Sequence, residues 1–245
     1  MRRKTGAKGW MAIKLDLEKA YDRLRWDFIH ATPLQMKLPD SLVEVIMNCI
    51  TSCSMNILWN GEPMEPFKPS RGIRQGDPLY PYPFVACMER LLQLIEAYYI
   101  GGHWKAILIT KGGTRISHLM FTDDVVLFGE ASRDQAQAIK NCLREFCEAL
   151  GQKISTQKSR ILFSSNTNAA VIMEVCNVLS IQKTDDFGQY LGVPTIHGRV
   201  TKSTFQDVIT RVDKRLAGWK TKCLSLAGRA TLIQATIVAI PAYVM

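Results

Sequence analysis

Hydrophobic and polar positions alternate near the start of the chain. Between Met11 and Glu18 the odd-numbered residues are all apolar, and the even-numbered ones include Lys14 and Asp16. A period of two residues predicts a β-strand with one buried face. Lys14 and Asp16 are therefore expected on the opposite face of that strand.

A second pattern of this kind occurs in the middle of the chain. Two short apolar runs, over 116–121 and 125–128, lie on either side of Thr122-Asp123-Asp124. This arrangement predicts a β-hairpin with two adjacent acids at its tip.

Helices are predicted where apolar residues recur every three or four positions, over 84–95 and 136–150. Ser132 and Gln135 have the spacing of a capping box before the second helix, and Gly151 is placed to end it. Further helices are expected over 168–180, 203–217 and 225–240, with a short strand near 190–193. Because strands and helices mix irregularly, the predicted fold class is α+β rather than a regular βαβ winding.

Composition narrows the class of protein. The chain has 245 residues, of which 47% are hydrophobic and 22% charged, which excludes a disordered, collagen-like or disulfide-scaffold protein. The net charge is +9, and between Arg199 and Arg229 eight cations stand against two anions. A basic balance favours a polyanionic partner, although a solvated basic surface gives the same pattern.

The compartment is expected to be intracellular, either the nucleus or the cytoplasm. The seven cysteines include no C-x-x-C pair and no zinc-ligand spacing, which favours reduced thiols. The first residues are basic without an apolar stretch behind them, so no signal peptide is expected. The apolar segment 230–245 is shorter than the ~20 residues of a membrane span, which favours a buried helix and no membrane partner.

The two adjacent acids of the predicted hairpin suggest a site for a divalent cation. Two carboxylates ~4 Å apart repel by about 1 kcal/mol in water and about 4 kcal/mol at a protein surface, and a divalent cation offsets this repulsion. Asp-Asp is also ordinary turn chemistry. Asp16 favours the first interpretation, because three carboxylates converge if the two strands are neighbours in one sheet. Such a set can hold two Mg²⁺ ions for in-line phosphoryl transfer.

Five segments follow one another in an informative order: 14–22 (KLDLEKAYD), 71–79 (RGIRQGDPL), 121–124 (FTDD), 151–159 (GQKISTQKS) and 190–194 (YLGVP). They resemble motifs A, B, C and D, and the segment after them, of the reverse transcriptases of non-LTR retrotransposons (LINE elements). Residues 216–241 also resemble the start of the thumb in plant elements of this type. The resemblance covers nearly the whole chain and implies a right-hand polymerase palm, an antiparallel sheet backed by helices.

The resemblance implies a metal site and its chemistry. Asp16, Asp123 and Asp124 are implied as catalytic ligands of two Mg²⁺ ions, with Mn²⁺ as an alternative. The Leu17 carbonyl is implied as a further metal ligand. Lys158 is implied as the proton donor to the departing pyrophosphate, and the simpler alternative is an exposed lysine at the start of a strand.

Other residues are implied to bind the substrates. Tyr21 would be the steric gate that excludes a 2′-hydroxyl, although a tyrosine in the core of a helix fits the same position. Gln75 and Gly76 would contact the template base and the incoming nucleotide, and Arg71 and Arg74 would hold phosphates. The alternative for this segment is an ordinary basic surface loop.

Three positions depart from the family's usual pattern. Thr122 replaces a common Ala, Tyr80 a common Ser and Pro83 a common Leu. A proline in a helix interior costs ~3 kcal/mol, so Pro83 would kink a helix that started at Pro78 and would do little harm in one that started later.

The implied function is that of an RNA-directed DNA polymerase, a reverse transcriptase that transfers nucleotides to a primer 3′-end. Residues 1–198 would form the palm with a remnant of the fingers, and 199–245 the basic start of the thumb. The implied partners are an RNA template, a DNA primer and a deoxynucleoside triphosphate (dNTP). The chain is expected to be a truncated piece that lacks the endonuclease, fingers and remaining thumb of a parent polyprotein. The alternatives are a non-catalytic nucleic-acid-binding remnant and another metal-dependent phosphoryl-transfer enzyme such as a nuclease.

Overall fold

The computed structural model describes residues 8–108, 112–191, 193–195, 205–216 and 224–237. The chain forms two compact units, Met1–Asp185 and Asp186–Met245. The predicted boundary between 198 and 199 falls outside the described residues and stays a prediction. Within the described part of the chain, no helix is both long and apolar enough to cross a membrane.

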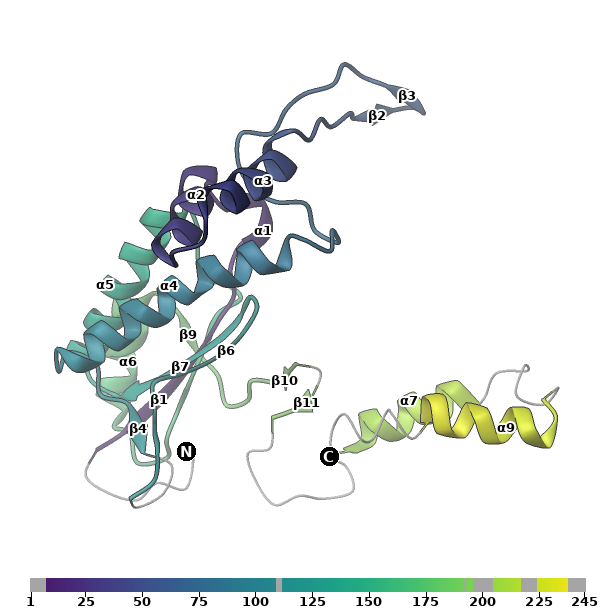
Figure 1. Cartoon of the computed structure of the whole chain (residues 1–245). Coiled ribbons are helices and arrows are strands. Elements are labelled where there is room, and N and C mark those ends of the chain that lie inside the picture. The colour runs from purple at the N-terminus through teal and green to yellow at the C-terminus, as the bar shows by residue number, and fades with distance from the viewer. Residues whose placement is uncertain (1–7, 109–111, 192, 196–204, 217–223, 238–245) are drawn as a thin grey trace. The chain divides into compact units, whose positions relative to one another are not determined.

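The first unit is built on a five-stranded sheet in the order β6-β7-β1-β8-β9 (Figure 1). The central strand β1 pairs antiparallel with both β7 and β8, and β6 pairs antiparallel with β7. Strands β8 and β9 pair parallel. The strands are β1 (Trp10–Leu15), β6 (His118–Phe121), β7 (Asp124–Glu130), β8 (Arg160–Phe163) and β9 (Gln182–Lys183). The predicted first strand and central hairpin are confirmed.

The described residues of the first unit form six helices: α1 (Ala20–Arg23), α2 (Trp26–Gln35), α3 (Asp40–Thr51), α4 (Pro81–Ile100), α5 (Arg133–Leu150) and α6 (Ala169–Leu179). Two small hairpins, β2 (Leu58–Trp59) with β3 (Glu62–Pro63) and β4 (Ile107–Leu108) with β5 (Arg115–Ile116), lie between them in sequence. The mixture of a mainly antiparallel sheet and helices confirms the α+β class.

The core forms where one face of the sheet meets the long helices. Met11, Ile13 and Leu127 share one buried cluster with Leu91 of α4 and Ile139 of α5. These side chains occupy alternate strand positions and the apolar stripes of the helices, as their sequence periods require. Lys14 and Asp16 are partly exposed on the opposite face.

The helix ends follow local rules with one exception. The Ser132 hydroxyl accepts a hydrogen bond from the Gln135 amide at 3.3 Å, and Gly151 ends α5 with a left-handed φ of 77°. The side chain of Gln135, however, bonds the Lys105 amide and the His103 carbonyl instead of returning to Ser132. Only half of the predicted capping box therefore forms, because a tertiary contact takes the glutamine.

The second unit contains the hairpin β10 (Gln189–Tyr190) and β11 (Val193–Pro194), the helices α7 (Gln206–Leu216) and α9 (Leu226–Leu232), and the π-helical turn η2 (Ile233–Ile237). The helices predicted over 203–217 and 225–240 are confirmed in their described parts. Of the basic residues of this region, Arg211, Lys214 and Arg215 lie on α7 and Arg229 on α9, whereas Arg199, Lys202, Lys220 and Lys222 fall outside the described residues.

Candidate active site

Asp16 and Asp124 are brought together by the register of the central strands. The last pair of the β1–β7 ladder is Leu15 with Val125, so the next antiparallel position sets Asp16 opposite Asp124. Residues opposite each other in an antiparallel pair project from the same face of the sheet with Cα atoms ~4.5–5.5 Å apart. Both aspartates are partly exposed there, on the face away from α4 and α5.

The backbone of Asp16 is fixed by the loop that precedes β8. Its amide donates to the Ser159 hydroxyl at 3.1 Å, and its carbonyl accepts from the Ser155 amide at 2.8 Å. Ser159 is fully buried and Ser155 is 7% exposed. These bonds lie on the β8 side of the strand and leave the Asp16 carboxylate directed away from the core.

The Leu17 carbonyl is directed toward the hairpin side of β1. Leu17 forms an antiparallel bridge with Ile154, and the bonds around it are made by its neighbours, from the Glu18 amide to Lys153 and from the Ser155 amide to Asp16. In such a non-hydrogen-bonded pair the amide and carbonyl of the central residue point away from the partner. Leu17 therefore presents its carbonyl on the side where Asp123 ends the turn.

The hairpin tip holds its acids with little support from other elements. Thr122 takes a left-handed φ of 52°, an uncommon conformation for a β-branched residue. Its hydroxyl lies 2.7 Å from the Phe121 carbonyl oxygen and 2.9 Å from Asp123 Oδ1, and it can donate its single proton to either. Asp123 itself is exposed.

Tyr21 lies close to this tip and is held by a stacked ring. Its ring is parallel to that of Phe84 within 9°, with centroids 4.4 Å apart. Burial, and then the negative charge of Asp123, raises the pKa of Tyr21 above its ordinary value of 10. The charge of Asp123 at the hairpin tip therefore acts on the phenol of Tyr21 in motif A.

The implied metal ligands are neighbours but do not form a ready-made cage. Among the described residues, no three His, Cys, Asp or Glu side chains are grouped to hold a metal ion. The donor chemistry nevertheless fits magnesium, because carboxylate and carbonyl oxygens are its usual protein ligands. Two carboxylates on one accessible sheet face, a third at the turn and an outward carbonyl supply such donors.

The loop over 66–77 packs against the chain segment that follows Asp16. The Gly72 amide donates to the Leu24 carbonyl at 2.7 Å and the Ile73 amide to the Tyr21 carbonyl at 3.0 Å. The Trp26 indole donates to the Gly72 carbonyl at 2.7 Å. Gly72 has a φ of +82°, and a Cβ there would lie 2.6 Å from the Asp22 carbonyl oxygen, so only glycine fits this contact.

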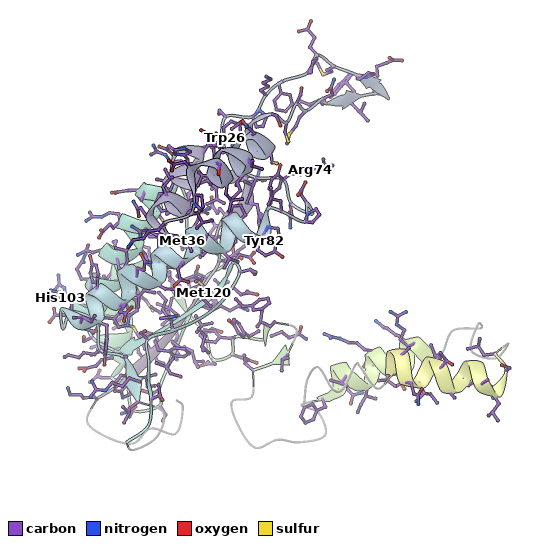
Figure 2. The ribbon with its side chains drawn as sticks, in the orientation of Figure 1. Trp26, Met36, Arg74, Tyr82, His103 and Met120 are labelled. Carbon is purple, nitrogen blue, oxygen red and sulfur yellow. The ribbon has the colours of Figure 1, made fainter. Side chains whose placement is uncertain are left out.

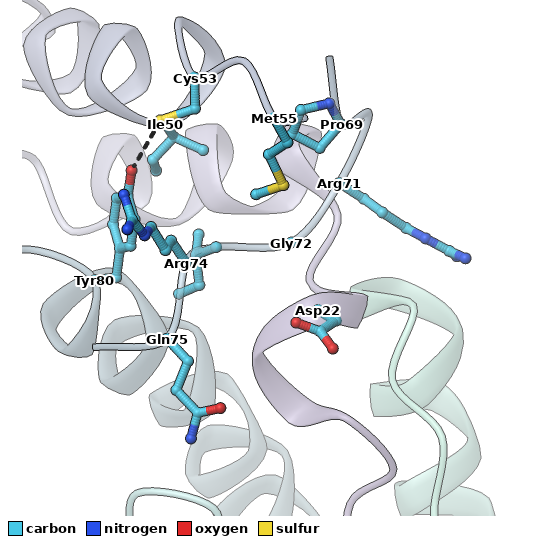
Figure 3. Close-up of a pocket in the computed structure, with 11 residues that line it drawn as sticks. Asp22, Ile50, Cys53, Met55, Pro69, Arg71, Gly72, Arg74, Gln75 and Tyr80 are labelled. Atoms are coloured by element: carbon cyan, nitrogen blue, oxygen red, sulfur yellow. Dashed lines mark hydrogen bonds between the residues drawn. The ribbon is translucent and has the colours of Figure 1, made fainter. Parts of the chain in front are cut away.

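The same loop lines a pocket of about 320 Å³ with Asp22, Cys53, Arg74, Gln75 and Tyr80 among its walls (Figure 3). Arg71 also lines it, and its side chain extends away from the pocket in Figure 3. Gly76 has a φ of +93° with no atom within 4 Å of the place a Cβ would take. The four residues implied for motif B thus stand together on one accessible loop.

Lys158 lies on the loop that fixes Asp16. It directly precedes Ser159, its own amide donates to the Ser155 hydroxyl at 3.4 Å, and its side chain is exposed. The structure therefore places Lys158 beside the anchor of Asp16 and leaves its ammonium group accessible.

Two of the three departures from the family pattern are accommodated by the fold. Helix α4 begins at Pro81, so Pro83 lies in its first turn, where a missing amide costs little. The Tyr80 hydroxyl donates to the Cys49 carbonyl at 3.1 Å and lies 3.6 Å from Cys53 Sγ. Burial is the main reason that the pKa of Tyr80 is raised to about 12, and Tyr80 joins α4 to α3 as part of the core.

Three supporting residues carried no role in the sequence interpretation. Phe84 stacks on Tyr21, and the buried Gln152 donates to the Ala20 carbonyl at 2.7 Å. Arg160 pairs in register with Lys14, which puts two cations next to Asp16 on one face of the sheet. The position of Gln152 in the motif D segment is a sequence feature that could have indicated its supporting role. No local sequence feature indicates such a role for Phe84 or Arg160.

Comparisons with known proteins identify the family of the chain. The family described as reverse transcriptase (RNA-dependent DNA polymerase) matches residues 2–195. The Pol polyprotein of the retrotransposable element R2DM of Drosophila melanogaster is 28% identical over 205 residues, which are 79% of this chain and 18% of that protein. An uncharacterized mitochondrial protein of Arabidopsis thaliana, AtMg01250, is 45% identical over 74 residues, 29% of this chain and 61% of that protein.

Solved structures of telomerases share the fold. A telomerase structure from Candida albicans aligns with 85% of this chain and 36% of its own length, at 12% identity and a TM-score of 0.53. A truncated apo telomerase from Candida tropicalis aligns with 66% of this chain and 32% of its own length, at 13% identity and a TM-score of 0.51. The chain therefore belongs to the reverse transcriptase family, as its resemblance to the enzymes of non-LTR retrotransposons predicted.

Proposed function

We propose that this chain is the palm of an RNA-directed DNA polymerase, which extends a DNA primer on an RNA template with deoxynucleotides. The observation that carries the proposal is the β1–β7 register, which sets Asp16 opposite Asp124. The chain spans 18% of the length of the R2DM polyprotein.

Asp16, Asp123, Asp124 and the Leu17 carbonyl would hold two divalent cations, Mg²⁺ or Mn²⁺. Bound there, the cations would activate the primer 3′-hydroxyl and neutralise charge on the triphosphate. The 3′-hydroxyl releases its proton to solvent as its oxygen bonds to the α-phosphorus and the bond to pyrophosphate breaks. Lys158 supplies a proton to the departing pyrophosphate. The protein mainly positions groups and offsets charge, as phosphoryl transfer requires.

The substrates would lie over the accessible face of the sheet. Arg71 and Arg74 offer guanidinium groups for phosphates, and the open backbone at Gly76 allows a base or nucleotide to approach Gln75. Tyr21, held by Phe84, would lie under the sugar and exclude a 2′-hydroxyl. The basic helices α7 and α9 would contact the primer–template backbone, so binding there should weaken as salt rises.

Primer extension tests the proposal directly. A labelled oligo-dT primer on poly-rA should lengthen when Mg²⁺ and dNTP are both present. Asp16→Ala and Asp123→Ala should each abolish extension, while circular dichroism shows an unchanged fold. Glu62→Ala, a matched loss of an exposed acid on the β2–β3 hairpin, should extend normally.

Each other outcome contradicts a definite part of the proposal. Extension that persists in either aspartate variant removes the metal assignment. Shortening of the primer with Mg²⁺ alone identifies a nuclease. Template binding without extension, also after a fingers segment is supplied, identifies a non-catalytic nucleic-acid-binding protein.

A further inference from the structure

The opposite end of the central strands carries a second cleft, remote from the carboxylates. It has a volume of about 600 Å³ and is lined by residues at the start of β1, the end of β7 and the segment after α4. In sequence, His103 lies between Gly102 and Trp104, which both line the cleft. Figure 2 shows His103 at one end of α4, and Arg74 and Tyr82 at the other end. Trp10 and Asp16 are six strand residues apart, about 20 Å at ~3.3 Å per residue.

The cleft has an excess of positive charge. Lys8, Lys105 and Arg115 line it with Glu130 as the single acid among its lining residues. Lys8 Nζ and Lys105 Nζ lie 3.4 and 3.5 Å from the same Glu130 Oε2. The two lysine side chains are 65% and 53% exposed, against 14% for Glu130. One carboxylate thus orients two ammonium groups at the rim and balances only one of them.

Aromatic rings stand beside these cations. Trp10 and Tyr99 line the cleft and are partly exposed. Arg115 Nη1 donates to the Tyr99 hydroxyl at 3.4 Å, a bond that uses one of the five guanidinium N–H groups. Trp104 is 1% exposed, and its indole donates to the Phe128 carbonyl at 2.9 Å, so this wall is fixed to the sheet.

We propose that this cleft binds a short single-stranded stretch of nucleic acid, separately from the polymerase site. Rings that accept stacked bases beside cations that follow a phosphate backbone are the usual means of binding single strands without sequence preference. The volume lies within the range of ligand pockets, ~300–1,000 Å³, which suits one or two nucleotides. The site would hold a strand about 20 Å from Asp16 and would not take part in the reaction.

An acidic protein segment is a weaker fit for the same cleft. Such a segment would pair with the cations but offers no planar group to stack on the ring of Tyr99. The combination of rings and a surplus of two positive charges favours nucleotides, whose bases and phosphates use both features.

Fluorescence anisotropy of a labelled single-stranded RNA, about four nucleotides long, tests the site in the full chain without metal ions. Lys105→Gln combined with Arg115→Gln should weaken binding at least about tenfold and reduce the salt slope by about 0.7 per cation. The matched control, Lys140→Gln with Arg144→Gln, removes two exposed charges of α5 and should change affinity less than about twofold.

Two further measurements separate stacking from charge and this site from the polymerase site. Trp10→Leu should weaken RNA binding about tenfold, whereas Trp10→Phe keeps a ring and most of the affinity. Asp16→Asn should leave binding of the short RNA unchanged, so failure of the polymerase proposal would not affect it.

Equal losses in the two double variants would overturn the proposal, since binding would then follow overall charge. Tighter binding of a polyglutamate peptide than of the RNA, lost in Lys105→Gln with Arg115→Gln, would assign the cleft to a protein segment instead.

Discussion

Two loops pack against the same short segment after Asp16, and they differ in almost every other respect. The loop over 151–159 is buried at Gln152, Ser155 and Ser159 and bonds the segment at several backbone positions. The loop over 66–77 is buried only at Gly72 and Ile73, and its basic side chains are exposed. The first loop holds the carboxylate in place, and the second offers accessible donors to a ligand.

The two loops should also differ in how well they tolerate substitution. A buried hydrogen-bonding group cannot be removed without leaving its partner unsatisfied, whereas an exposed side chain can change with little effect on stability. Substitutions in the 151–159 loop and at Gly72 should therefore lower stability. Substitutions of Arg71, Arg74 and Gln75 should instead weaken substrate binding.

The largest effect on stability is expected at Gly72, an anchor of the exposed loop. Gly72→Ala should lower the free energy of unfolding by about 3 kcal/mol, because φ is +82° and the new Cβ would meet the Asp22 carbonyl. Gly76→Ala, with a similar φ but open space, should cost about 1 kcal/mol. Urea denaturation measures both, and equal costs would show that the anchor does not exist.

The next effect concerns sugar selection, where the 66–77 loop and α4 meet motif A. Tyr21→Ala should raise the use of ribonucleotides relative to deoxynucleotides by about a hundredfold, because the ring that excludes the 2′-hydroxyl is gone. Tyr21→Phe keeps the ring on Phe84 and should keep selection. Steady-state incorporation of each nucleotide measures this, and unchanged selection in Tyr21→Ala would remove the gate.

A smaller loss is expected in the buried loop. Ser159→Ala removes the acceptor of the Asp16 amide and should cost about 1–2 kcal/mol of stability, with slower extension because Asp16 shifts. Ser155→Ala is the matched control, since its hydroxyl accepts only a 3.4 Å bond from Lys158 while its backbone holds Asp16. Thermal unfolding and primer extension would distinguish Ser159→Ala from Ser155→Ala. Equal stability and equal extension rates in the two variants would contradict the anchoring role of the Ser159 hydroxyl.

The smallest effect is spectroscopic and reports on the geometry of the site. Burial and the Asp123 charge both favour the protonated phenol of Tyr21, so its ionisation should occur above pH 10 and folding should lose this stabilisation as pH rises further. Asp123→Asn should move the pKa of Tyr21 back toward 10. The difference between the ultraviolet titrations of the unchanged protein and Tyr21→Phe gives the ionisation of Tyr21. An unchanged pKa in Asp123→Asn would show that the charge at the hairpin tip does not act on Tyr21.

Sequence patterns alone were sufficient to predict the strand and the hairpin that carry the acids. Alternation around Asp16 and the apolar runs around Asp123 were enough to predict one strand and one hairpin, and both form. Local periodicity has this power because burial of one face is decided by neighbours in sequence. The same holds for the Ser132 and Gly151 ends of α5.

The positions of these elements relative to one another depend on how the chain packs in three dimensions. The pairing of Leu15 with Val125 sets Asp16 beside Asp124, and a shift of one residue would have sent one of them to the core. The stacking of Phe84 on Tyr21 and the docking of Gly72 join residues distant in sequence. The side chain of Gln135 donates to the distant His103 carbonyl instead of completing the capping box, because long-range hydrogen bonds depend on which surfaces meet and not on local sequence.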